Sequence, residues 1–176
     1  ARCMIHKLSN ILRRLLRRQE SFTALSEELS FIDDYLDIEV VRFGAAKLKI
    51  EKEVDQGTLD MQVPSMLLQP IVENSLKHGL SPRLAGGVVR IRSMRLDGRL
   101  AIEVEDNGVG MTAEMLAGGP SGGIGLANVQ ERLKVLYGSD FAFRIVSEPG
   151  QGTKVQIELP DVTAPSPPAR QTQGVA

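Results

Sequence analysis

The chain has 176 residues, with 21 lysines and arginines against 22 aspartates and glutamates, a formal net charge of −1 and one cysteine. Hydrophobic residues make up 42% of it, enough for a packed core, which excludes wholesale disorder and collagen-like repetition. The balanced charge gives no general reason to bind nucleic acid, and a single cysteine cannot form an intrachain disulfide. No apolar run reaches the roughly 18 residues that span a bilayer. We therefore expect one cytoplasmic domain with attachments, cut from a longer protein, with no nucleic acid partner.

Residues 5–43 carry apolar side chains at helical intervals, which predicts two helices. The first is basic, with four arginines between its leucines, and the second is acidic. The arginines fit a membrane surface or nucleic acid, but charges between leucines are more typical of a solvated helix face.

After Gly44 the apolar residues alternate with a period of two, which predicts strands. Asp97 and Gly98 form a hairpin turn for one antiparallel pair, and the glycine-rich stretch 149–153 joins a second pair. Strands in antiparallel pairs with helices between them predict an α+β fold rather than a doubly wound parallel sheet. The expected strands are 48–51, 89–92, 100–104, 141–146 and 154–159, and the expected helices between them are 66–77 and 124–137.

Two glycine-bearing stretches have chemical interest. The sequence EDNGVGM (105–111) ends a predicted strand, where an aspartate can accept a hydrogen bond from an exocyclic amine and the glycines allow close backbone approach. An ordinary turn explains it equally well. The sequence GGIGL (122–126) precedes a helix, whose N-terminus favours phosphate. It is neither a Rossmann fingerprint nor a P-loop, because it lacks the βαβ unit and the Gly-Lys-Ser/Thr ending.

A polar helix is the third feature. Asn74, Lys77 and His78 are three and four residues apart and project from one face, which can hold a metal-phosphate complex. Alternatively, Lys77 and His78 complement a helix dipole and Gly79 ends the helix. The stretch PGQGT (149–153) is also explained by a turn alone. Together, in the chain order polar helix, EDNGVGM, GGIGL and PGQGT, the four features indicate a nucleotide site.

The sequences EN-SLKHG, EDNGVGM, GGIGLANVQERL and GQGT resemble the N, G1, G2 and G3 boxes of the GHKL ATP-binding superfamily, which includes gyrase, heat-shock chaperones, histidine kinases and mismatch-repair ATPases. Within it, MLLQPIVENSLKHG, GIGLANVQERLKVLYG and EELSFIDDYLDIEVVRFG resemble the LytS-like sensor histidine kinases. The resemblance covers roughly 5–160 and implies a two-layer α/β sandwich of Bergerat type with a mixed, largely antiparallel sheet. It implies an incomplete dimerisation region at 1–45 and an ATP-binding catalytic domain at 46–160. Residues 161–176 are proline-rich and contain too little apolar material to offset the entropy of ordering, which predicts a disordered tail.

The same resemblance implies roles for single residues. Asp106 would accept a hydrogen bond from the adenine amino group, with Thr153 supporting it through water, and Asn74 would hold Mg²⁺. Glu73, beside the metal ligand, is a candidate general base, although neighbours on a helix face different directions and a structural role is equally open. The other implied contacts to ATP are Lys77 and His78 at the phosphates, Gly108 and Gly110 in the adenine pocket, and Leu126. Gly123 and Gly125 would form the hinge of a lid at 112–122.

Two departures from the family pattern bear on function. Hydrolytic relatives carry a water-activating glutamate four residues before the metal-binding asparagine, where this chain has Pro70, which favours a kinase. The His-Phe-Leu-Phe-Asn motif that carries the phosphoacceptor is absent, and the only histidines are His6 and His78. We therefore expect the acceptor outside this chain, in a homodimeric parent that is bound to the inner or plasma membrane by other segments and passes the phosphoryl group to a response regulator receiver domain.

Two other functions stay open at this stage. The first is a GHKL module that uses ATP to control binding, or an anti-sigma-type serine kinase. The helices upstream of the catalytic domain favour the histidine kinase, since anti-sigma proteins resemble the GHKL domain without that leader. The second is a nucleotide-binding domain that has lost catalysis, against which stand four intact boxes.

Overall fold

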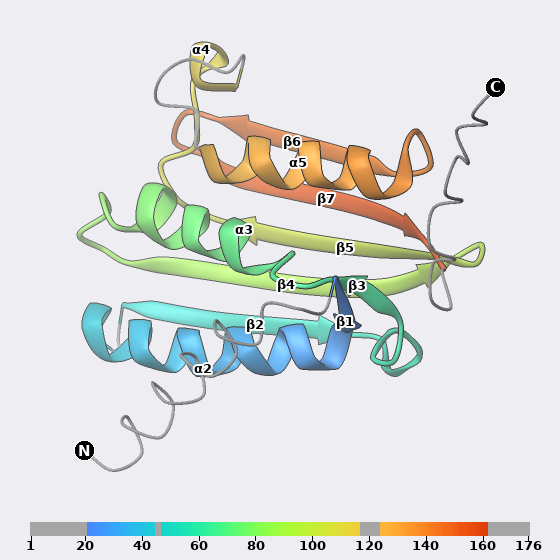
Figure 1. Ribbon diagram of the computed structural model, residues 1–176. Helices are drawn as coiled ribbons and strands as arrows, with labels where there is room; N and C mark the ends of the chain where they lie inside the picture. Colours follow the sequence, from blue (N-terminus) through green and yellow to red (C-terminus); the bar gives the residue numbers. More distant parts are fainter. Residues whose placement is uncertain (1–20, 45–46, 117–123, 162–176) are drawn as a thin grey trace, which may run out of the picture.

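The computed structural model describes residues 21–44, 47–116 and 124–161 (Figure 1). A five-stranded sheet with the order β2-β4-β5-β7-β6 forms its centre. Strand β2 runs parallel to β4, and every other neighbouring pair is antiparallel, which confirms the mixed, largely antiparallel sheet. The strands are β2 (Leu48–Val54), β4 (Gly87–Leu96), β5 (Arg99–Asp106), β6 (Ala142–Glu148) and β7 (Gly152–Pro160).

Both predicted hairpins are present. Between β4 and β5, Asp97 and Gly98 have φ angles of 50° and 75°, the left-handed pair that a tight two-residue hairpin turn requires. Strand β7 ends at Pro160, and the next residue, Asp161, donates its backbone N–H to the Gly98 carbonyl oxygen (3.2 Å) and pairs its carboxylate with Arg95. Asp161 is the first residue of the predicted tail 161–176, and the rest of that tail, 162–176, lies outside the described residues.

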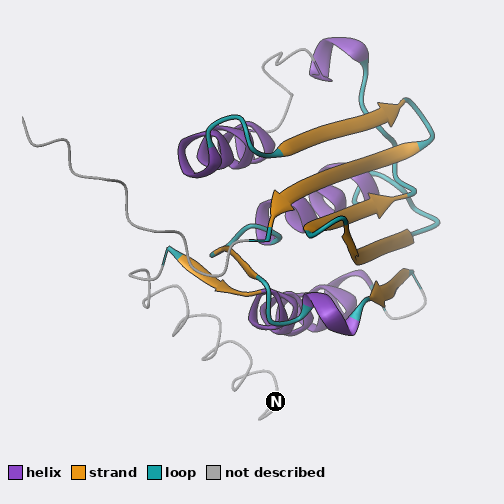
Figure 2. Cartoon of the chain, turned by 90° about the vertical axis from the view of Figure 1, so that its right-hand side faces the viewer, coloured by secondary structure: helices purple, strands orange, loops and turns teal. Residues whose placement is uncertain are grey.

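Helices cover one face of the sheet, as Figures 1 and 2 show. The long ones are α2 (Leu25–Phe43) and α5 (Ile124–Tyr137), and between them lies α3 (Gln69–Asn74), which continues as the π-helix η2 (Ser75–Leu80). Four short elements complete the described part: η1 (Gln56–Thr58), α4 (Ala113–Leu116) and the antiparallel strands β1 (Phe22–Ala24) and β3 (Gln62–Pro64). The first predicted helix lies outside it.

The start of α3 differs from the prediction. The helical pattern predicted a start at Met66, but Met66 has a φ of 60°, which is not helical. The helix begins at Gln69 and places Pro70 in its first turn, where the missing N–H of proline costs no hydrogen bond. The three residues before the helix therefore form a separate turn.

A single hydrophobic core joins the helices to the sheet. Helix α2 contributes Leu25, Leu29, Ile32 and Leu36 to the same buried cluster as the sheet residues. At about 1.5–3 kcal/mol for each buried aliphatic side chain, this packing holds α2 firmly on the sheet. The division of the chain at residue 45 stays a prediction, but the structure gives α2 no separate core among the described residues.

The opposite face of the sheet is charged. Its arginine and lysine side chains pair with glutamates on neighbouring strands, and the paired groups are partly exposed to solvent. Because its side chains are charged, this face of the sheet does not pack against helices, and the helices cover only the apolar face. Within 21–44, 47–116 and 124–161, no helix has the length and apolar character that crossing a bilayer requires.

Candidate nucleotide site

The strand alternation of β5 buries an aspartate at the end of the sheet. Leu100, Ile102 and Val104 face the helices, each with an exposed fraction of 2% or less. The period of two continues to Asp106, which is also buried, with an exposed fraction of 2%. A carboxylate thus takes the place of the next core side chain.

The carboxylate of Asp106 has one oxygen satisfied and one unsatisfied. Oδ1 accepts a hydrogen bond from the Gly108 backbone N–H (2.8 Å), whereas Oδ2 is buried and has no hydrogen-bond partner in the described part of the chain. Burial raises the pKa of Asp106 and the Glu105 carboxylate adds to this, while the Gly108 amide, the Ser75 hydroxyl and the Thr153 backbone oppose it. An unpaired buried acceptor costs about 1–3 kcal/mol, so this oxygen is suited to a ligand that brings a donor.

The backbone around Asp106 packs so closely that it requires glycine. A Cβ on Gly79 would lie 2.7 Å from Oδ1 of Asp106, and a Cβ on Gly108 would lie 2.4 Å from the carbonyl of Gly79. The Val109 N–H donates to the same carbonyl oxygen (2.9 Å). The EDNGVGM segment is therefore more than a free turn, because it closes directly on the polar helix.

The G1 and G3 stretches also interlock. Gly110 has a φ of 68°, and a Cβ there would lie 1.9 Å from the carbonyl oxygen of Glu148. The Gly150 N–H donates to the Val109 carbonyl oxygen (2.7 Å). The turn 149–153 thus joins β6 to β7 and also holds the G1 segment (105–111) in place.

The polar helix widens where it reaches Asp106. In η2 the Ser81 N–H donates to the Leu76 carbonyl oxygen five residues earlier (2.9 Å), the hydrogen bond of a π-helix. Such π segments are rare and are frequent at functional sites. The helix runs through Gly79 to Leu80, so the alternative in which Gly79 ends the helix is wrong. Gly79 instead supplies the close contact with Asp106.

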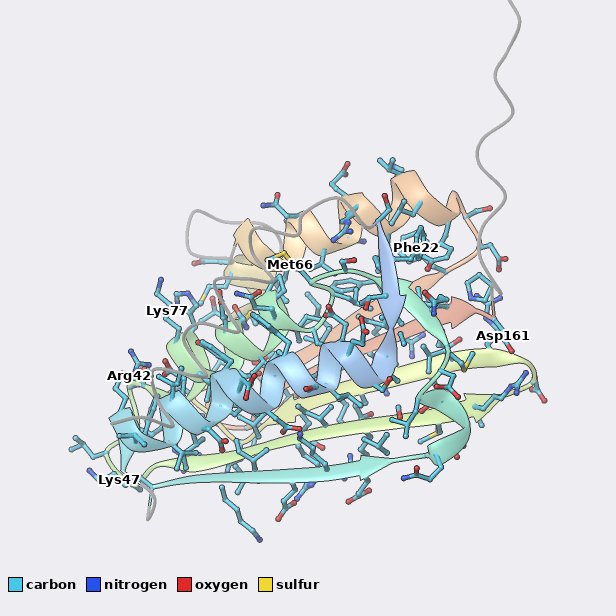
Figure 3. The ribbon with its side chains drawn as sticks, turned by 60° about the horizontal axis from the view of Figure 1, so that its bottom comes forward. Phe22, Arg42, Lys47, Met66, Lys77 and Asp161 are labelled. Carbon is cyan, nitrogen blue, oxygen red and sulfur yellow. The ribbon has the colours of Figure 1, made fainter. Side chains whose placement is uncertain are left out.

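Three predicted ligand contacts lie along this helix. Asn74 is the last residue of α3 and is half-buried, and no hydrogen bond to its side chain is present among the described residues. Lys77 and His78 follow within η2 and are exposed, and Figure 3 shows Lys77 reaching outward. Their roles at the metal and the phosphates stay predictions.

The side chain of Glu73 lies near α2. Its Oε1 accepts a hydrogen bond from Nε2 of Gln69 (2.7 Å). Burial, together with the carboxylates of Glu39 and Glu73, raises the pKa of Tyr35 in α2 to about 12. These contacts support the structural role that the sequence left open, and the role of general base stays a prediction.

The G2 stretch lies partly within the described residues. A Cβ on Gly125 would lie 3.6 Å from that of Pro70, an ordinary contact, so packing alone does not require glycine there. Leu126 is buried with an exposed fraction of 4% and anchors the first turn of α5 in the core. Gly123 falls in 117–123, which lies outside the described residues, and the hinge stays a prediction.

Sequence reasoning missed Ser147. Its Oγ accepts from the Met111 N–H (2.8 Å), donates to the Gly152 carbonyl oxygen (2.8 Å) and lies 2.9 Å from Oγ1 of Thr153. Since a hydroxyl has one proton, Thr153 donates to Ser147 and keeps its lone pairs for an incoming donor. Thr153 pairs with Asp106 across the two strands, and its role at adenine stays a prediction. The sequence did carry a sign of this role, because Ser147 is a polar residue on the inward side of β6, where Phe143 and Ile145 are apolar.

Comparison with known proteins gives the family. Residues 60–163 match the model described as histidine kinase-, DNA gyrase B-, and HSP90-like ATPase, and residues 1–48 match the histidine kinase model. The chain is 31% identical over 157 residues to the sensor histidine kinase YesM of Bacillus subtilis and 33% identical over 157 residues to BtsS of Escherichia coli. Each alignment covers 89% of this chain but only 27% of the relative, so the chain spans about a quarter of their length.

A solved structure supports the fold. The histidine kinase domain of the blue-light activated kinase EL346 from Erythrobacter litoralis superposes with a TM-score of 0.59 and 21% identity, covering 90% of this chain and 73% of that one. The chain belongs to the histidine kinase-, DNA gyrase B-, and HSP90-like ATPases and carries the ATP-binding catalytic domain of a two-component sensor histidine kinase of the LytS, YesM and BtsS type.

Proposed function

We propose that this domain binds Mg²⁺-ATP and directs its γ-phosphoryl group to a histidine outside this chain. The observation that carries the proposal is the buried Asp106 with an unpartnered Oδ2. The exocyclic amine of adenine donates to that oxygen, whereas guanine presents a carbonyl oxygen at the corresponding position. The backbone of Gly79 packs directly against the carboxylate, and that of Gly108 packs against Gly79.

Asn74 is the proposed protein ligand for Mg²⁺. Its amide oxygen is the hard type of ligand that Mg²⁺ prefers, and Mg²⁺ commonly takes its other ligands from phosphates and water. Among the described residues, there is no group of three or more His, Cys, Asp or Glu side chains that could hold a metal ion, so phosphates and water would have to supply the other ligands. Bound Mg²⁺ would supply charge neutralisation at the phosphates, and Lys77 and His78, exposed on η2, would approach the same oxygens.

The proposed chemistry is transfer to an external nucleophile. The acceptor nitrogen forms a bond to the γ-phosphorus as the bond to the bridging oxygen breaks, and ADP leaves with that oxygen. Pro70 occupies the position of the water-activating glutamate of hydrolytic relatives, so this position supplies no base to water. Positioning and electrostatics, on which phosphoryl transfer depends, then favour an oriented histidine over solvent.

The whole parent would act as a homodimer and pass the phosphoryl group to an aspartate of a response regulator receiver domain. The kinase domain would work in the cytoplasm, with the parent bound to the membrane by segments outside this chain. These proposals follow from the family, since the curated relatives are sensor histidine kinases several times longer than this chain.

Phosphorylation assays on two lengths of chain test the proposal. A longer chain that also includes the first dimerisation helix of the parent should become labelled by γ-labelled ATP. The 176-residue chain should not, because neither of its histidines lies in the acceptor motif. The label should be acid-labile, as phosphohistidine is. Acid-stable label on a serine, or rapid ATP hydrolysis by the 176-residue chain, would instead favour a serine kinase or an ATP-gated module.

A further inference from the structure

We propose that Glu28 of helix α2 is a positioning residue for α3, the helix that carries the proposed metal ligand Asn74. This role rests on the proposed function of Asn74. Glu28 is buried, with an exposed fraction of 4%, and it is far from the four nucleotide boxes in the sequence. Its Oε1 accepts from the Met66 N–H (2.7 Å) and its Oε2 accepts from the Leu68 N–H (3.2 Å).

Glu28 thereby caps α3 from another element. The first amides of a helix have no partner within the helix, and Leu68, the residue that precedes α3, provides no side-chain cap. The left-handed Met66 turns its own amide toward the same carboxylate. With its continuation η2 the helix covers only residues 69–80, a length that is marginal for an isolated helix in water, so its position depends on such tertiary contacts.

The turn that Glu28 caps is fixed from the other side as well. Arg132 of α5 donates from Nη1 to the carbonyl oxygen of Ser65. In the view of Figure 3, Met66 lies between α2 and α5. Helices α2 and α5 thus hold the segment 65–68 from opposite sides.

The position of this turn sets the position of Asn74. Asn74 lies six residues after Leu68, at the other end of α3, and Ile71 and Val72 between them are fully buried. Because a buried helix of this length moves as one body, a shift at its start is carried to its last residue. Glu28 lies in the part matched by the histidine kinase model and Asn74 in the part matched by the ATPase model, so the contact couples the two.

Nucleotide titration of four proteins tests this role: wild type, Glu28→Gln, Asn74→Ala and the control Glu27→Gln, which alters an exposed carboxylate one residue away. Calorimetry measures ATP affinity with Mg²⁺ and with EDTA. Glu28→Gln puts an amide N–H₂ against one of the two backbone amides and should weaken Mg²⁺-ATP by about tenfold, a typical effect for residues that orient a metal ligand. Metal-free ATP should change by less than about twofold on the same reasoning. Glu27→Gln should match wild type.

Amide hydrogen exchange separates positioning from general loosening. In Glu28→Gln the amides of Met66 and Leu68 should exchange faster, while those of Val89 and Ile102 in the sheet should keep their wild-type rates. If the sheet amides also exchange faster and both forms of ATP lose affinity equally, Glu28 is merely structural. If Glu28→Gln fails to fold, Glu28→Asp, which keeps the charge but shortens its reach, decides the question by the same titration.

Asn74→Ala distinguishes the two proposals. If it removes the preference for Mg²⁺-ATP while Glu28→Gln leaves that preference intact, the positioning role fails and the proposed function stands. If Asn74→Ala retains the full preference, the metal assignment in the proposed function fails, and the role of Glu28 falls with it.

Discussion

Replacing Asp106 by asparagine should lower the affinity for ATP by roughly tenfold to a hundredfold, which corresponds to the loss of about 1–3 kcal/mol from one buried hydrogen bond. The side-chain oxygen that accepts from Gly108 can stay, so the new N–H₂ takes the place of Oδ2 and faces the adenine amine, donor against donor. Titration calorimetry at fixed Mg²⁺ measures the change. Asp60→Asn, which alters an exposed carboxylate, is the control.

The same variant should change the pH dependence of stability. Burial raises the pKa of Asp106, so the native state binds its proton more tightly than the unfolded state does. The stabilisation from that proton is complete below the ordinary pKa of aspartate and is lost as pH rises through the raised native pKa. Urea unfolding across this range should show the decline in wild type and in Asp60→Asn, and a smaller decline in Asp106→Asn. An identical decline in all three would contradict the buried carboxylate.

Replacing Gly152 by alanine should have the largest effect on folding. Gly152 has a φ of 85°, and a Cβ there would lie 2.0 Å from the carbonyl oxygen of Asp106. The left-handed backbone costs about 1–2 kcal/mol for alanine. The overlap adds about 1–3 kcal/mol or more, because β5 and β7 must separate where they meet.

Gly150 provides a matched control in the same turn. Its φ is 81°, but a Cβ there has nothing within 4 Å, so alanine should cost only the backbone term of about 1–2 kcal/mol. Urea denaturation of both variants gives the two losses in the free energy of unfolding. Equal losses would show that the close approach to Asp106 does not constrain the turn.

Much of the fold could be predicted from local pattern. Alternation located the five strands of the main sheet, and the helical stripe placed α5 at the residues observed. The parallel pairing of β2 with β4 could not be predicted, because it joins segments about forty residues apart and no local signal fixes their register. The pair β1 and β3 is three residues long on each side, too short for alternation to show.

Site residues could be predicted where the alternation of a strand or a glycine-rich segment marks them. Asp106 continues the inward phase of β5, and its resemblance to the family motif points to the same residue. Glu28 was missed because its partners, Met66 and Leu68, lie far away in the sequence. Ser147 was missed although Gly152 and Thr153 follow it closely, because its contact with Met111 depends on how the fold brings β6 to the G1 segment. On a predominantly acidic helix, a buried glutamate cannot be told from its exposed neighbours without the fold.

Calorimetric titration of the whole chain with ATP and with GTP, both with Mg²⁺, tests the central claim most directly. An adenine site built on Asp106 predicts one molecule of ATP per chain and GTP binding at least about tenfold weaker, since guanine has a carbonyl oxygen where adenine has the amine that would satisfy Oδ2. Equal affinity for the two nucleotides would contradict the adenine site and with it this account of the domain.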